Sequence, residues 1–215
     1  MKEWFGWHFL QKSRELRWGT QEVVETGKIY TAKGKLKMCY NGLHASARAI
    51  DALLYAPGPI VCRVELLGKR IDKEDKSVAQ ERRVVALADA TQVLHEFSCH
   101  CATAALCFAE IKDKRCWRAI EAKWSWLRGD ITNAELAAAA DAARVGYAAS
   151  DIVSDAASAV TRAAAKYDIS DDAWYAAYNA ARAVVRYDDA AEKSIRNEQN
   201  DLLEDMLIEL LKLDR

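Results

Sequence analysis

The spacing of apolar residues changes character near residue 90. Before that point, short apolar runs between Gly and polar turns predict strands, most clearly at 4–10 and 60–67. The segment 78–88 fits a strand or a helix equally well. Beyond residue 91 Ala dominates and apolar residues recur at helical spacing. This pattern predicts an α+β chain, with a small mixed α/β domain over 1–90 and an all-α antiparallel helical bundle over 91–215.

Local signals in the second half predict where helices begin and end. Gly129 is a typical C-terminal stop, and Thr132 with Glu135 has the form of a capping box. The last helix places leucines at helical spacing, with acids and Lys212 on its other faces. Such a stripe either closes the helical domain or forms the seam of a homodimer, and we favour the dimer.

One stretch of the first domain combines a sharp turn with polar side chains. Gly42 permits a close backbone approach, and Ser46 is a plausible N-cap for a helix over 47–55, whose free N–H groups would favour an anion. We therefore predict a pocket between the His8 strand and the turn 41–46, to which Arg63 adds a cation if its side chain faces inward. The predicted ligand-binding residues are His8, Asn41, Gly42, His44, Ser46 and Arg63.

Two simpler interpretations of that stretch stay open. His8 is flanked by aromatic residues, so it fits a core histidine as well as a ligand contact. The sequence Gly42-Leu43-His44 could also do no more than form a stable corner, in which case the contact surface would be the acidic helical domain.

Charge, hydropathy and cysteine usage disfavour nucleic-acid-binding and membrane-spanning proteins and favour a cytoplasmic one. The net charge of −1 hides 16 Lys and Arg against 11 Asp and Glu in residues 1–90, and 15 against 21 in the remainder. Without a concentrated basic face, nucleic acid is not the favoured partner. No apolar run approaches the roughly 20 residues of a membrane span. The six cysteines lie in apolar or helical surroundings, which suits reduced thiols in the cytoplasm.

The evidence for other reactive or metal-binding groups of residues is weaker. His95 and Cys99 are four residues apart on one predicted helix face, but there is no paired Cys-x-x-Cys, so a small core cysteine is favoured over a metal site. His44 and Ser46 lack a nucleophile-elbow motif and an obvious orienting carboxylate. There is no P-loop and no Gly-x-Gly-x-x-Gly. We therefore predict neither a metal nor a cofactor.

Roughly the first 90 residues resemble an uncharacterised domain that is common in bacteriophage proteins. The shared motifs are Gly-Trp-His-Phe-Leu at 6–10, Gly-Leu-His-Ala-Ser at 42–46, Tyr-Ala-Pro-Gly at 55–58 and Cys-Arg-Val-Glu-Leu at 62–66. The helical part over 116–129 is similar to Ala-rich predicted immunity proteins. Together these resemblances imply a phage or prophage origin.

The same first domain also resembles, more distantly, the nucleotide-binding half of ADP-ribosyltransferase folds. That resemblance implies that His8, with His44 or Ser46, would orient NAD. The catalytic Gln-x-Glu or Glu-x-Glu motif of those enzymes does not follow Glu65. We therefore expect a non-catalytic binding protein of the counter-defence type, which inhibits a bacterial host factor or sequesters a small nucleotide signal. An NAD-dependent ADP-ribosyltransferase is the alternative, and a structural interaction module is a third class.

Overall fold

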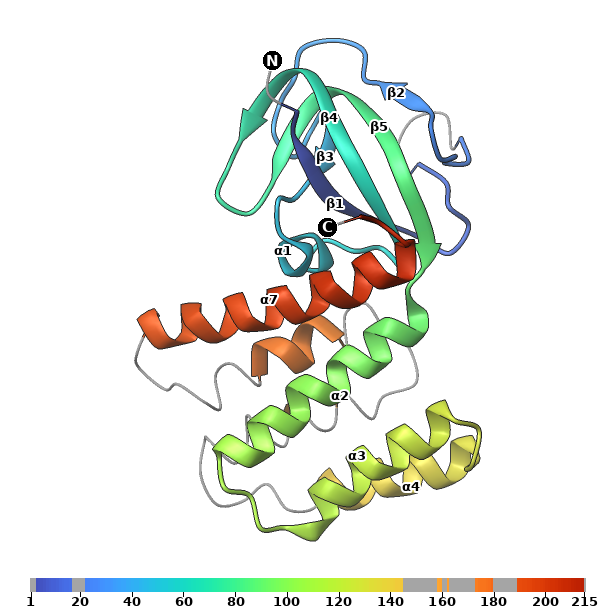
Figure 1. Ribbon diagram of the computed structural model, residues 1–215, viewed down its shortest axis with the longest axis vertical. Coiled ribbons are helices and arrows are strands. Elements are labelled where there is room, and N and C mark those ends of the chain that lie inside the picture. The colour runs from blue at the N-terminus through green and yellow to red at the C-terminus, as the bar shows by residue number, and fades with distance from the viewer. Residues whose placement is uncertain are drawn as a thin grey trace. The chain divides into compact units, whose positions relative to one another are not determined.

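A computed structural model describes residues 3–16, 22–144, 158–159, 162, 173–179 and 189–214. The chain divides into two compact units. The first contains residues 1–91 together with 203–215, and the second contains residues 92–202. The architecture is α+β, as predicted, with an antiparallel sheet in the first unit and helices in the second (Figure 1).

The described elements keep the labels of Figure 1. The strands are β1 (Phe5–Leu10), β2 (Ile29–Thr31), β3 (Leu43–Ala45), β4 (Ile60–Asp72) and β5 (Ser77–Asp89). The helices are α1 (Ala49–Leu53), α2 (Thr91–Phe108), α3 (Lys114–Leu127), α4 (Asn133–Arg144) and α7 (Asp189–Leu211). In the part of the chain that is described, no helix is both long enough and apolar enough to cross a membrane.

The long strands β4 and β5 form the middle of the sheet, in the order β1-β4-β5-β2 (Figure 1). Because β5 is the hydrogen-bonded centre of this sheet, the segment 78–88, which periodicity left undecided, is a strand. Strands β2 and β3 both pair with β5 along the same edge, β3 with residues 77–79 and β2 with residues 81–83. All these pairings are antiparallel.

The sheet curls on itself. Ser46, just beyond β3, makes a bridge with Trp7 of β1, through N–H···O bonds of 2.7 and 2.9 Å. The segment 43–46 thus joins the β5 side of the sheet to its β1 edge. One face of the sheet consequently turns inward, and it carries a buried cluster consisting of Leu10, Val24, Tyr30, Ala45, Ile60, Cys62, Val64, Leu66, Ala79 and Val84.

The helix after β3 is shorter than predicted. It covers Ala49–Leu53, and its N-cap is Arg48 with no side-chain cap, so the prediction that Ser46 caps a helix over 47–55 is wrong. Ser46 cannot do so because its backbone belongs to the bridge with Trp7. The N–H of Ala49 instead donates to Oε1 of Glu204 at 3.0 Å. A carboxylate from the far end of the chain therefore occupies the start of α1 within the first unit.

The helices of the second unit follow their sequence signals. Asp113 caps α3 by accepting the N–H of Arg115, and Gly129 follows the end of that helix with a φ of +82°. Thr132 and Glu135 form the predicted capping box, with the Thr132 N–H donating to Glu135 Oε2 at 2.7 Å.

Candidate anion-binding site

The most unusual residue of the first unit is Arg82, in the middle of β5. Antiparallel register places it beside Leu66 of β4 and Tyr30 of β2, which are both buried. Side chains of paired residues point to the same face of a sheet, so the guanidinium lies on the inward face. Only 2% of Arg82 is exposed. Arginine is rarely buried to this extent without a charged partner.

No carboxylate among the described residues pairs with this guanidinium. The groups that act on it electrostatically are Cys62 and Tyr30. Burial raises the pKa of Cys62 to about 12, so its thiol is protonated at neutral pH. The hydroxyl of Tyr30 hydrogen-bonds to the backbone at Val23 and Glu25. Burial in turn lowers the pKa of Arg82 from 12.5 to about 10, which shows that its charge is poorly compensated.

One hydrogen bond holds Arg82 in place. Its Nη1 donates to the backbone oxygen of His44 at 2.8 Å. Its Nε is buried and has no hydrogen-bond partner in the described part of the chain. A buried donor without a partner costs about 1–3 kcal/mol, so an acceptor that reaches it would bind favourably.

His8 lies on the same inward face as Arg82. It is opposite Cys62 in the register of β1 and β4, and as a residue it is half-buried. Burial, followed by the positive charge of Arg82 and then by His44, lowers the pKa of His8 well below its ordinary value of 6.5. The ring is therefore neutral at pH 7. The structure thus brings together the predicted residues His8 and His44 and adds Arg82 to them.

His44 has a largely structural environment. Its Nε2 accepts the N–H of Cys39 at 3.1 Å, so Nδ1 carries the proton of the neutral ring. Its pKa is lowered by burial, then by Lys76 and Arg82, against an opposing hydrogen bond to the backbone of Gly42. The ring consequently stabilises the turn, while the backbone oxygen positions Arg82.

Asn41 and Gly42 shape that turn. Asn41 donates through Nδ2 to the backbone oxygens of Lys33 and Lys35, at 2.9 and 3.0 Å, and so ties the preceding loop to the turn. Gly42 has a φ of +129°, and a Cβ atom there would lie 2.3 Å from Cγ2 of Val78. Both residues therefore have clear structural roles.

The structure does not bring Ser46 and Arg63 to the inward face beside His8. Ser46 is buried in the bridge to Trp7. Arg63 pairs with Trp7, one position away from the His8–Cys62 pair, so strand alternation directs it to the opposite face. There its guanidinium lies 4.6 Å from the Trp7 ring centroid and interacts electrostatically with Glu204.

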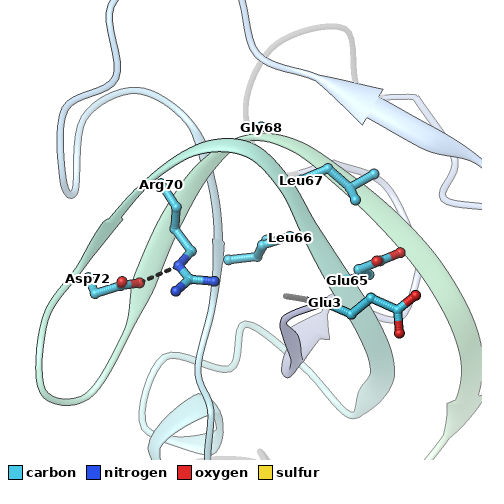
Figure 2. Close-up of a pocket in the computed structure, with 7 residues that line it drawn as sticks. All are labelled: Glu3, Glu65, Leu66, Leu67, Gly68, Arg70 and Asp72. Carbon is cyan, nitrogen blue, oxygen red and sulfur yellow. Dashed lines mark hydrogen bonds and ion pairs between the residues drawn. The ribbon is translucent and has the colours of Figure 1, made fainter. Parts of the chain in front are cut away.

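A cavity of about 350 Å³ lies elsewhere on the first unit, along β4 beyond the end of its pairing with β1. Figure 2 shows Glu3 and Glu65 toward one end of it, and Arg70 with Asp72 toward the other. Arg70 Nε lies 2.6 Å from Asp72 Oδ1. Arg83 Nη2 lies 2.5 Å from Oε2 of the buried Glu65, in an ion pair without hydrogen-bond geometry. Three carboxylates line this cavity, so it would repel an anion.

The constellation of His95 and Cys99 lies on α2 in the second unit. The His95 ring packs edge-on against Trp126, at 5.2 Å between ring centroids, and burial lowers its pKa to about 3. Burial raises the pKa of Cys99 to about 12. Both side chains are thus packed as neutral groups. In the described ranges no three His, Cys, Asp or Glu side chains are grouped as metal ligands would be.

One family model matches part of the chain. Residues 13–96 match the model of a domain of unknown function (DUF7666). Comparisons with the curated proteins and with the solved structures gave no match. The matched segment contains Arg82 and His44, while His8 precedes it.

Sequence reasoning missed Arg82, the most buried cation of the first unit's sheet. One signal could have found it. In Val-Ala-Gln-Glu-Arg-Arg-Val-Val at 78–85, strand alternation puts Arg82 on the same face as Val84, which is apolar. An arginine in an apolar register is informative, but only after the segment is known to be a strand.

Proposed function

We propose that the first unit binds a small anionic ligand, most simply the phosphate group of a nucleotide, without transforming it. The observation that carries this proposal is that Arg82 is only 2% exposed and has no carboxylate partner among the described residues. A protein interior compensates a buried charge unless an external partner supplies the opposite charge. A bound phosphate would supply it.

The position of the acidic residues favours binding over transfer of ADP-ribose. Glu65 is the carboxylate nearest in sequence to the place of the missing transferase motif. It pairs with Phe5 and Arg83, and strand alternation directs it away from the face that carries His8. Its carboxylate also forms an ion pair with Arg83. It is therefore poorly placed to act on a ligand held beside Arg82.

For the biological role, we propose that the protein is a phage-type counter-defence protein, which acts in the cytoplasm of a bacterial host by sequestering a nucleotide signal. The N-terminal motifs that resemble a phage domain support this form. We also propose that the protein inhibits a host protein and assembles as a homodimer. The ligand experiment below does not test these two points.

The experiment is a thermal-shift screen of the full chain against inorganic phosphate, nucleoside mono- and diphosphates and cyclic nucleotides. It uses two matched variants, Arg82→Lys and Arg83→Lys. These make the same chemical change at adjacent residues on opposite faces of β5. We expect at least one phosphate compound to stabilise the parent chain and Arg83→Lys. We expect Arg82→Lys to lose most of that shift. No stabilisation by any phosphate compound, or equal shifts in all three proteins, would refute the proposal.

A further inference from the structure

The geometry of the inward face restricts which phosphate it accepts. His8 is half-buried and more accessible than Arg82, which lies beneath the surface at 2% exposure. No described residue forms a hydrogen bond with the His8 ring. The His8 ring is therefore able to hydrogen-bond a ligand held within the field of Arg82.

We propose that the site selects a phosphate monoester over a phosphodiester, and that His8 takes up one proton when the monoester binds. This inference rests on the proposed function and names the ligand class more narrowly. A diester carries one negative charge, which Arg82 alone can neutralise. A monoester carries about two at pH 7.5, because its second pKa is near 6. The second charge favours a second cation, and His8 is the accessible group that can become one.

The groups that face His8 agree with this role. Arg82 on β5 and His44 on β3 act on it electrostatically, and Cys62 lies directly opposite on β4. None of them is negatively charged at neutral pH, because the Cys62 thiol is protonated. The free site therefore keeps His8 neutral. A dianion beside the ring reverses this preference, and the proton comes from the buffer.

His44 is a positioning residue in this scheme. Its Nε2 already accepts the Cys39 N–H, so protonation at that atom would break an existing hydrogen bond. One proton rather than two is accordingly expected.

The test is isothermal titration calorimetry of the full chain with AMP and with 3′,5′-cyclic AMP at pH 7.5, in two buffers of different ionisation enthalpy. We expect AMP to bind on the order of tenfold to a hundredfold more tightly, the range of one charge-assisted hydrogen bond, with uptake of about one proton. Cyclic AMP should bind with almost no uptake. His8→Gln should remove both the proton uptake and the discrimination. His100→Gln, an exposed histidine of the second unit, should keep both.

The possible failures are distinct. Equal affinities for AMP and cyclic AMP in the parent chain would overturn this inference, and so would proton uptake that persists in His8→Gln. Because the parent chain alone gives the first of these results, the test stands even if the variant folds poorly. If Arg82→Lys does not weaken either nucleotide, the proposed function itself fails.

Discussion

The replacement Arg82→Met removes the buried charge while keeping an unbranched side chain of similar length. The pKa of Arg82 falls from 12.5 to about 10 on folding. At about 1.4 kcal/mol for each pKa unit, the unliganded protein loses about 3 kcal/mol of stability by holding this charge. The variant regains that energy but leaves the His44 backbone oxygen without its donor, at a cost of about 1–3 kcal/mol. We expect stability to be unchanged or to rise by up to about 2 kcal/mol.

Urea unfolding at pH 7 without ligand, followed by circular dichroism, measures this change. Arg83→Met provides the contrast, because it leaves the buried carboxylate of Glu65 without its ion-pair partner. We expect that variant to lose about 1–3 kcal/mol. If Arg82→Met instead lost about 3–5 kcal/mol, as breaking a buried ion pair does, Arg82 would be a structural charge and the reasoning would be refuted.

Two further substitutions test the environments of single residues. Burial lowers the pKa of His95 to about 3. Between pH 6.5 and pH 3 the unfolded chain therefore binds a proton at this residue, whereas the folded chain does not. The stability of the folded chain consequently falls as the pH falls through that range. At pH 5 this loss is about 2 kcal/mol. Urea unfolding measures the difference in the free energy of unfolding between pH 7 and pH 5, which should be smaller in His95→Gln than in the parent chain and unchanged in His100→Gln. An unchanged difference in His95→Gln would contradict this prediction. Gly42→Ala should be destabilised by about 2–4 kcal/mol, because the new Cβ would lie 2.3 Å from Val78 Cγ2, whereas Gly27→Ala, with open space around it, should lose about 1 kcal/mol from its positive φ alone. Equal thermal melting shifts for the two alanine variants would rule out the predicted clash.

The sequence predicted the fold class because local patterns control it. The apolar run at 60–67 is most of β4, and the Thr132–Glu135 box begins α4 where expected. The segment 78–88 could not be assigned because both faces of β5 are largely covered, which removes the alternation that identifies a strand. The curl of the sheet depends on the long-range bridge between Trp7 and Ser46, which no local pattern encodes.

The candidate site could be predicted from the sequence less completely than the fold. The residues His8 and His44 were selected for their chemistry, and the sheet brings both near Arg82. Arg63 was included because its face could not be known before the register was known. The contact of Glu204 with α1 joins residues 155 positions apart, so the sequence held no sign of it.

The central claim is that Arg82 receives an anion from solvent, and the resonance of its own Nε–H group tests it most directly. In a ¹H–¹⁵N spectrum of the full chain titrated with AMP, we predict a saturable shift of the Arg82 Nε–H resonance, assigned by its absence in Arg82→Lys. The Arg83 Nε–H resonance should stay in place, because that side chain lies on the other face. Saturable AMP binding, detected by other resonances, that leaves the Arg82 resonance unmoved would contradict the account.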